Sequence, residues 1–231
     1  MQIAGLQKTT LLDYPGHVAA TIFLSGCNFR CPFCHNMNIV LPFSDGPMIS
    51  KEELMTFLNK RKEILDGVCI TGGEPTLHSD LEELIRRIKE LGLRVKLDTN
   101  GTKPEVVAHL LDEYLLDYVA MDIKGSRGIF EMITGAPVSC FDKVVETIRL
   151  LINSEVAYEF RTTIIEEYHT IDEIRKIGEL ISGAKHYYLQ SFVDSEYVPD
   201  HTLHACNKEK LIEMKEYLST YIDDVEIRGV E

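Results

Sequence analysis

The chain has 231 residues, of which 45% are hydrophobic and 26% are charged, fractions that are ordinary for a folded globular protein. Its formal net charge of −13 disfavours general nucleic-acid binding, because an acidic surface repels phosphate. No apolar run approaches the roughly 18 residues of a membrane span, and the N-terminus lacks a signal-peptide pattern. We therefore expect a single cytoplasmic domain over residues 1–231, with no membrane segment.

Short apolar segments rich in β-branched or aromatic residues recur along the chain, as is typical of buried strands. They are Ala19–Ser25, Val68–Thr71, Arg94–Asp98, Tyr118–Ile123, Ala157–Ile164, His186–Gln190 and, near the C-terminus, Val225–Arg228. Between them, apolar residues at helical spacing predict amphipathic helices. These begin near Ser50 and Pro104 and otherwise cover Ser79–Leu91, Phe141–Ile152, Thr170–Ile181 and Asn207–Tyr221.

Three of the predicted helices carry a capping-box signature, in which a Ser or Thr is followed three residues later by Glu. The pairs are Ser50 with Glu53, Ser79 with Glu82, and Thr170 with Glu173.

Alternation of six strands with helices predicts an α/β fold, with parallel strands and helices outside them. Polar groups stand at or just after nearly every strand: Cys27, Gly72–Pro75, Asp98–Gly101, Asp122, Lys124, Arg161, Gln190 and Ser191. A barrel would arrange them around one mouth, whereas an open doubly wound sheet would concentrate them at one crevice. We favour a partial (β/α)6 barrel of the TIM type.

Three of the six cysteines, Cys27, Cys31 and Cys34, form the pattern C-x3-C-x2-C. Cubane iron–sulfur clusters usually have four cysteine ligands, so three would leave one iron open for a substrate. A structural zinc site that adds His35 is the alternative. It is disfavoured because adjacent Cys34 and His35 would have difficulty reaching one ion, and because no second ligand pair is present.

With Phe33 before the last cysteine, this pattern resembles the signature of the radical S-adenosylmethionine (SAM) superfamily. The Gly72–Pro75 segment is similar to that family's second motif, a turn at a strand end that binds the SAM amino group. Further segments resemble glycyl-radical-enzyme activases, and most closely the activating proteins of anaerobic ribonucleoside-triphosphate reductase. They are Asp13–Gly16, the loop from Phe23 to Asn36, Asp98–Gly101 and Met121–Lys124.

The resemblance implies that Cys27, Cys31 and Cys34 hold a [4Fe–4S] cluster and that SAM binds its open iron. It also implies an external flavodoxin or ferredoxin as reductant and a 5′-deoxyadenosyl radical as product. In an activase this radical takes a hydrogen atom from a glycine of a partner, here a glycyl-radical enzyme of the anaerobic ribonucleotide reductase type. The cofactor supplies the chemistry, and the protein supplies binding and orientation.

The resemblance also assigns residues to SAM, with Phe33 in the cofactor-binding motif. Gly72 and Gly73 lack a Cβ and would let the backbone approach the ligand closely. Glu74 would accept hydrogen bonds from the SAM ammonium, and Pro75 would stiffen the turn. The alternative for Glu74 is a solvated turn carboxylate.

Asp98, Thr99 and Asp122 match positions that bind a monovalent cation near the SAM carboxylate in related activases, and oxygen ligands suit a hard cation. The alternative at Asp98–Gly101 is an Asx-type turn.

Lys124 and Arg161 would hold the SAM carboxylate or ribose, since a buried charge needs a partner. A structural salt bridge is the alternative for Arg161. Gln190 and Ser191 are expected to touch SAM or the target, whereas mid-strand Cys69 is interpreted as a small buried hydrophobe.

Two other functions stay open at this point. One is a radical SAM enzyme for a small molecule, resembling 7-carboxy-7-deazaguanine synthases; the other is a non-catalytic metal- or cluster-binding protein. The Asp13–Gly16 segment and the ending of the cysteine loop at His35 and Asn36 favour the activase.

Overall fold

All seven predicted strands are present, and their ends differ from the prediction by one residue at most. They are β2 (Ala19–Leu24), β3 (Gly67–Gly72), β4 (Arg94–Thr99), β5 (Tyr118–Asp122), β6 (Ala157–Ile164), β7 (His186–Ser191) and β8 (Asp224–Arg228). An eighth strand, β1 (Ile3–Thr10), was not predicted because most of its residues are partly or fully exposed, so it lacks an apolar run.

The six predicted helices are also present, with shifted ends. They are α2 (Lys51–Arg61), α3 (Leu81–Glu90), α4 (Pro104–Asp112), α6 (Ser139–Ile152), α7 (Ile171–Leu180) and α8 (Lys208–Leu218). Short elements without a periodic signal were not predicted: α1 (Met37–Val40), α5 (Phe130–Thr134) and the 3-10 turn η1 (Pro75–Leu77). In the described part of the chain, no helix has the length and apolar character needed to cross a membrane.

The predicted capping boxes differ in outcome. At α2 the box is confirmed, because the Ser50 side chain accepts from the Glu53 amide and the Glu53 side chain accepts from the Ser50 amide. At α7 only half is present: Thr170 caps the helix, but the Glu173 carboxylate accepts hydrogen bonds from Ser126 instead.

The box at Ser79 is wrong. The residue that precedes α3 is Asp80, and its side chain makes no capping hydrogen bond. Its carboxylate instead lies 2.8 Å from the Lys51 ammonium and 3.1 Å from the amino group of Met1. These longer-range ion pairs hold the carboxylate away from the helix end.

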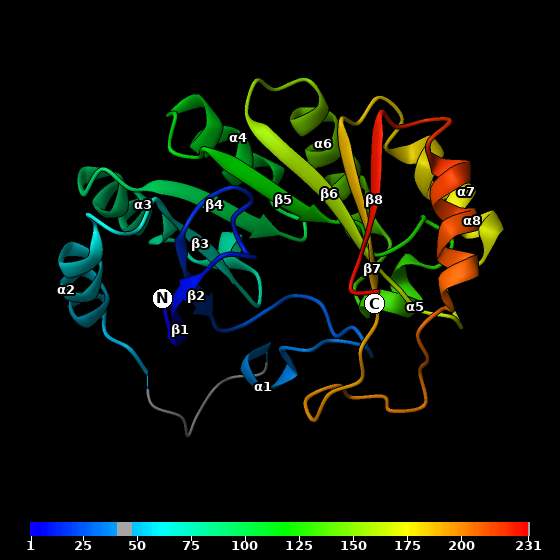
Figure 1. Cartoon of the computed structure of the whole chain (residues 1–231), viewed down its shortest axis with the longest axis horizontal. Helices are drawn as coiled ribbons and strands as arrows, with labels where there is room; N and C mark the ends of the chain where they lie inside the picture. Colours follow the sequence, from blue (N-terminus) through cyan, green and yellow to red (C-terminus); the bar gives the residue numbers. More distant parts are fainter. Residues whose placement is uncertain (41–47, 231) are drawn as a thin grey trace. The chain divides into compact units, whose positions relative to one another are not determined.

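The computed structural model describes residues 1–40 and 48–230 (Figure 1). The contacts between residues divide the chain into two compact units. The first unit contains Met1–Asn28, Asn38–Thr99 and Glu105–Val119. The second contains Phe29–Met37, Asn100–Pro104 and Ala120–Glu231. The chain passes from the first unit to the second within the cysteine motif, directly after β4 and again within β5.

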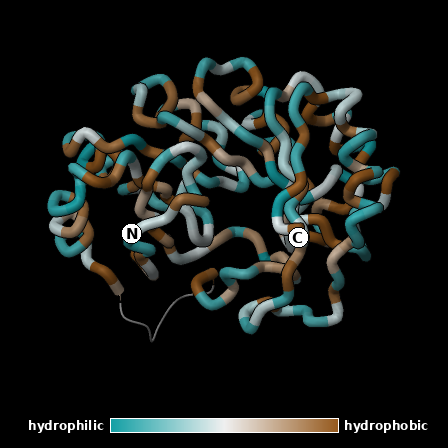
Figure 2. The backbone as a smooth tube through the Cα atoms, in the orientation of Figure 1, coloured by the Kyte–Doolittle hydropathy of each residue, from teal (hydrophilic) through white to brown (hydrophobic). Residues whose placement is uncertain are grey.

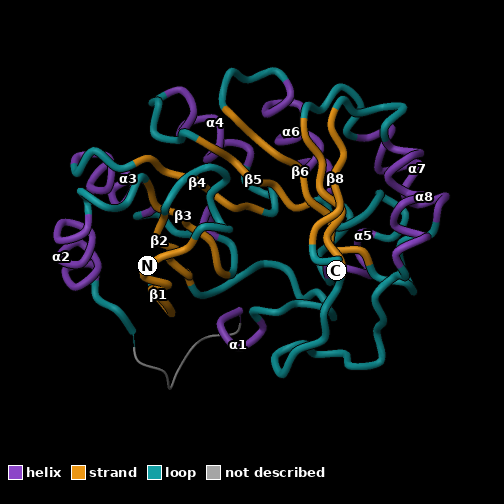
Figure 3. Tube along the Cα trace, in the orientation of Figure 1, coloured by secondary structure: helices purple, strands orange, loops and turns teal. Residues whose placement is uncertain are grey.

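In the first unit, β1 runs antiparallel to β2, and β2, β3 and β4 run parallel to one another. Helix α3 contacts β4 and α2 (Figure 3). Along β4, Val95 and Leu97 are fully buried on one face, whereas Lys96 and Asp98 point to the opposite face because side chains alternate along a strand. The second face of β4 is therefore polar.

In the second unit, β6, β7 and β8 run parallel, and α8 contacts both α7 and β8. Figure 2 shows hydrophobic and hydrophilic residues interleaved along these elements. Buried Tyr158 and Phe160 alternate on β6 with Glu159 and Arg161, so the strand has one apolar and one charged face. The predicted α/β class with parallel strands is confirmed.

Candidate active site

The Gly72–Pro75 turn, which begins at the last residue of β3, packs against the chain's own backbone. The Gly73 amide donates to the Leu24 carbonyl at 2.8 Å. A Cβ at Gly72 would lie 2.4 Å from the Leu24 carbonyl oxygen, and a Cβ at Gly73 would lie 2.0 Å from that of Gly26. Both glycines are therefore required by this close approach, which was not foreseen from the sequence.

Glu74 is fully buried, which excludes the solvated turn carboxylate. Its Oε1 accepts hydrogen bonds from the Thr76 hydroxyl at 2.5 Å, the Thr99 hydroxyl at 2.8 Å and the Thr76 amide at 3.1 Å. The Glu74 amide donates to the Gly26 carbonyl at 2.8 Å. The carboxylate is thus held in one position by short local contacts, as the acceptor for an ammonium group would need to be.

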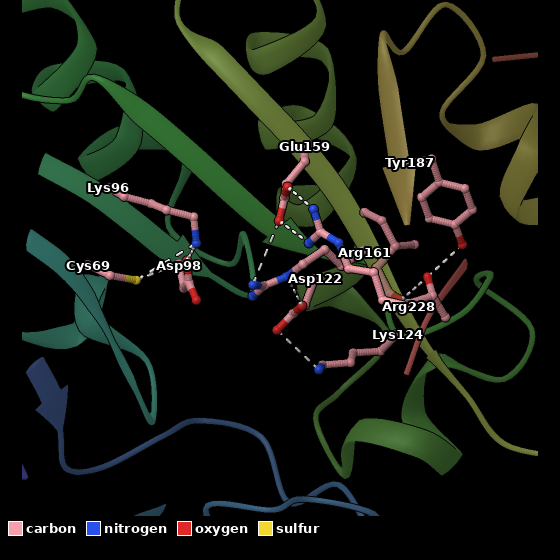
Figure 4. A network of polar contacts seen from close by, with 11 residues as sticks. Cys69, Lys96, Asp98, Asp122, Lys124, Glu159, Arg161, Tyr187 and Arg228 are labelled. Atoms are coloured by element: carbon pink, nitrogen blue, oxygen red, sulfur yellow. Dashed lines mark hydrogen bonds and ion pairs between the residues drawn. The ribbon is translucent and has the colours of Figure 1, made fainter. Parts of the chain in front are cut away.

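Asp98, near the end of β4, contacts a buried lysine that sequence reasoning missed. The Lys96 ammonium donates to Asp98 Oδ1, and it lies 3.8 Å from the Cys69 sulfur (Figure 4). Cys69 is fully buried, as predicted, but it also contacts polar groups, because its sulfur lies 3.7 Å from Asp98 Oδ1. An Asx-type turn is present in the Asp98–Gly101 segment, but it is made by Asn100.

In the second unit, Cys31 is buried and Cys34 is half-buried, with the Cys34 amide donating to the Cys31 carbonyl at 3.2 Å. Phe33 is buried, and the Lys124 ammonium lies 5.9 Å from the centroid of its ring. Burial raises the pKa of the Cys34 thiol, and Lys124 acts in the opposite direction. Lys124 is therefore close enough to stabilise thiolates in this loop.

The loop that follows β7 lies against the cysteine loop. A ring nitrogen of His35 lies 2.6 Å from the Val193 carbonyl oxygen, and the Asp200 amide donates to the Pro32 carbonyl at 3.0 Å. His35 thus contacts this loop, which accounts for a histidine beside Cys34 without making it a metal ligand.

Asp122, the last residue of β5, joins two of the predicted cationic residues. Its Oδ1 accepts from Arg161 Nε at 3.1 Å, and its Oδ2 accepts from Lys124 Nζ at 3.3 Å (Figure 4). Burial alone would raise the pKa of Asp122, but Arg161 and Lys124 outweigh burial and lower this pKa to about 2. Lys124 keeps its charge for a related reason. Burial alone would lower the pKa of Lys124, but Asp122, followed by Cys31 and Cys34, outweighs burial, so this pKa is raised.

A second carboxylate, Glu159 on β6, extends this network. It is 1% exposed and accepts two hydrogen bonds of 3.0 Å from the guanidinium of Arg228 on β8. The nearest Arg161 nitrogen lies 3.9 Å from Glu159. The salt bridge considered for Arg161 is therefore real, and it lies beside groups predicted to bind SAM. Gln190 is half-buried on β7, in register with Arg228.

Sequence reasoning missed Lys96, Glu159 and Arg228. The signal for the first two was a charged residue in the middle of an apolar strand, which indicates that one face of the strand does not meet an apolar core. For Arg228, the only sequence signal of a role in the site was its position at the end of a predicted strand. Its pairing with Glu159 depends on the order of β6, β7 and β8.

The donor set fits a [4Fe–4S] cluster and SAM in chemical terms. None of the six cysteines forms a disulfide, so three thiols remain in the motif, and a lysine beside two of them favours thiolates. Among described residues, no group of three or more His, Cys, Asp or Glu side chains has metal-binding spacing. Cys27 belongs to the first unit, and Cys31 and Cys34 to the second, so the ligand set stays a prediction.

The family is settled by comparison with known proteins. Residues 21–181 match the model of the radical SAM superfamily, and the chain belongs to that superfamily. It is therefore an enzyme, and its family implies a [4Fe–4S] cluster and SAM. The non-catalytic alternative is not favoured.

Within the superfamily, the chain is 32% identical over 238 residues to a protein of Methanocaldococcus jannaschii named "Putative glycyl-radical enzyme activating enzyme MJ1227". That match covers 99% of this chain and 96% of the relative. A "Probable GTP 3′,8-cyclase" of Saccharolobus solfataricus is 38% identical over 130 residues, but the match covers only 55% of this chain and 41% of the cyclase.

Two solved structures share the fold. Streptococcus suis SuiB bound to its precursor peptide SuiA superposes with a TM-score of 0.71 at 15% identity, covering 91% of this chain and 48% of SuiB. The structure of anSMEcpe with bound AdoMet and a peptide superposes with a TM-score of 0.63 at 18% identity. This match covers 89% of this chain and 61% of the anSMEcpe chain. These matches confirm the predicted partial barrel fold.

Proposed function

We propose that the chain is an activase that installs a glycyl radical on a partner enzyme, acting as one radical SAM domain in the cytoplasm. The observation that carries the proposal is the match to an activating enzyme along nearly the whole length of both chains. The match to a small-molecule cyclase covers only part of each chain, which disfavours the small-molecule alternative.

In this proposal Cys27, Cys31 and Cys34 hold the cluster, which supplies the electron for reductive cleavage of SAM to a 5′-deoxyadenosyl radical. The Lys124 ammonium stabilises the thiolates of Cys31 and Cys34, because opposite charges attract strongly where water is scarce. The buried ring of Phe33 lies 5.9 Å from that ammonium.

The SAM ligands are proposed residue by residue. Glu74 accepts from the SAM ammonium, with Gly72, Gly73 and Pro75 setting the position of its backbone. Its rigid hydrogen bonds to Thr76 and Thr99 support this role, because a preorganised acceptor loses little freedom when the ligand binds.

Lys124 and Arg161 are proposed to hold the SAM carboxylate or ribose, with Gln190 as a further contact. The support is charge: Asp122 pairs with both cations, and the network of Lys124, Arg161 and Arg228 with Asp122 and Glu159 holds three positive and two negative groups. Such a cluster suits an additional anionic oxygen.

The first experiment is anaerobic reconstitution of the cluster, followed by addition of SAM and dithionite and an assay for 5′-deoxyadenosine. The wild type is expected to form it, and a Cys27→Ala, Cys31→Ala, Cys34→Ala variant is not. A well-formed cluster that neither binds nor cleaves SAM would overturn the proposal.

The second experiment tests the partner, which we propose is a glycyl-radical enzyme of the anaerobic ribonucleotide reductase type, with flavodoxin or ferredoxin as reductant. The expected result is a stable glycyl radical in electron spin resonance after incubation with such an enzyme. Cleavage of SAM without a glycyl signal on any candidate partner would favour a small-molecule substrate.

A further inference from the structure

The most unusual group outside the proposed SAM contacts is the ammonium of Lys96. The residue is 1% exposed, and its charge lies deep in the first unit. Its Nζ donates to Asp98 Oδ1, lies 3.8 Å from the Cys69 sulfur and lies 5.9 Å from the centroid of the Tyr118 ring. A charge buried this deeply is unfavourable unless it is paired, so the pairing with Asp98 stabilises both groups.

The strand geometry builds this position. Lys96 and Asp98 are two residues apart on β4, so they share a face, and Cys69 on β3 is the register partner of Lys96. The ammonium is therefore enclosed by a carboxylate, a sulfur and an aromatic face. It is a fixed feature of the sheet and differs from a flexible surface ion pair.

We propose that the Lys96 ammonium is the resident cation of Asp98 and excludes alkali-metal ions from this carboxylate. An alkali ion bound to Asp98 would lie within a few ångströms of Nζ, and two like charges so close repel strongly in a buried site. Sodium and potassium ions also need several oxygen ligands. The Cys69 sulfur and the Tyr118 ring, which both lie near Nζ, suit an ammonium better.

The other two predicted ligands of a monovalent cation are engaged as well. The Thr99 hydroxyl donates to Glu74 at 2.8 Å. In the second unit, both oxygens of Asp122 accept hydrogen bonds, one from Arg161 and one from Lys124. The chain thus supplies its own positive charges at both carboxylates.

One consequence rests on the proposed function: SAM binding is independent of sodium and potassium ions. The proposal about Lys96 itself does not need SAM, and it is tested first without it.

The first test measures the thermal midpoint of the full chain in KCl or NaCl against tetramethylammonium chloride at equal ionic strength. An ion that binds only the folded state raises the midpoint in a saturable way, so we expect the wild-type values to agree within about 1 °C. A saturable rise specific to potassium or sodium in the wild type would overturn the proposal.

The second test uses Lys96→Met, which removes the ammonium and keeps an apolar side chain of similar length. This variant is expected to gain a saturable alkali-specific rise, because the ammonium no longer occupies the position at Asp98 Oδ1. The control is Lys89→Met, which removes another Lys–Asp pair of the same unit, 2.7 Å to Asp117, and is expected to gain none. If Lys96→Met folds and its thermal midpoint does not rise with potassium or sodium, the ammonium does not occupy a cation site at Asp98, and the proposal fails.

Should Lys96→Met not fold, the wild-type measurement still decides. In addition, Lys96→Arg, which keeps the charge, is expected to have a thermal midpoint that is insensitive to alkali ions.

On the reconstituted wild-type protein, SAM affinity measured by equilibrium dialysis is expected to differ by less than about twofold between potassium and tetramethylammonium. Absence of SAM binding under every condition would refute the proposed function, whereas the thermal data would still decide on Lys96.

Discussion

At the scale of single residues, local geometry explains why particular side chains stand where the motifs require them. Gly73 is needed because its backbone lies against that of Gly26, one residue before Cys27. Glu74 is buried only because hydroxyl and amide donors surround it. Each of these positions tolerates few substitutions, since the constraint comes from backbone contact or from a buried charge.

The close approach of Gly73 gives the first prediction. In Gly73→Ala the new Cβ would lie 2.0 Å from the Gly26 carbonyl oxygen, so the backbone before Cys27 must shift. We expect a loss of about 3 kcal/mol in the free energy of unfolding, measured by urea denaturation, and reduced iron content after reconstitution. Gly128→Ala is the control, because its Cβ would meet only the Ser126 hydroxyl at 3.8 Å. Equal stability of both variants would contradict the argument.

The pair of Glu159 and Arg228 gives the second prediction. Arg228→Met leaves a carboxylate that is 1% exposed without its two 3.0 Å hydrogen bonds, so we expect a loss of about 3 kcal/mol in unfolding free energy. In a double-mutant cycle with Glu159→Gln, the two losses are expected to be non-additive by about 1–3 kcal/mol. Strict additivity would show that the pair is not coupled.

At the scale of elements, the helices begin where side chains can satisfy their first amide groups, but long-range ion pairs can override the local signal. Ser50 caps α2 as its sequence predicts. The same signature at Ser79 is not used, because Asp80 precedes the helix and is held by Lys51 and the N-terminus. Capping motifs are therefore informative only when no charged group from elsewhere competes for the same position.

This contrast gives the third prediction. Ser50→Ala removes a side-chain cap and is expected to lower the unfolding free energy by about 1 kcal/mol, whereas Ser79→Ala, which removes no cap, is expected to change it by less than about 0.5 kcal/mol. Urea denaturation of both variants measures the difference. A larger effect at Ser79 than at Ser50 would contradict the observed caps.

At the scale of the whole molecule, stability depends on pH through buried groups as well as through the net charge of −13. His169 is fully buried, with its Nδ1 accepting from the Ile165 amide at 2.9 Å and its Nε2 lying 3.2 Å from the Lys124 carbonyl oxygen. The fold therefore needs the neutral ring. Burial lowers the pKa of His169 from its ordinary value of 6.5 to about 4.

The fourth prediction follows from the sign of this shift. Between pH 6.5 and about 4 the unfolded chain binds a proton at His169 that the folded chain does not, so stability is lost as pH falls through this window. From pH 7 to pH 5 the wild type is expected to lose about 2 kcal/mol more unfolding free energy than His169→Gln. His204→Gln, which removes an exposed histidine, is the control. Parallel losses in wild type and His169→Gln would contradict the assignment.

The sequence by itself determined the alternating strands and helices, the parallel α/β class, the cysteine motif and the Gly72–Pro75 turn. These depend on periodicity and spacing over short distances along the chain, which folding preserves. It also determined the family, because two motifs in the right order are specific.

Only the tertiary structure decided how the charged groups are paired. Lys96 meets Cys69 because β3 and β4 lie in one register, and Arg228 meets Glu159 because β6, β7 and β8 are neighbours. Strand β1 is visible only through its pairing with β2. Such contacts join residues far apart in the chain, and their partners are chosen by sheet register and burial, which no local pattern encodes.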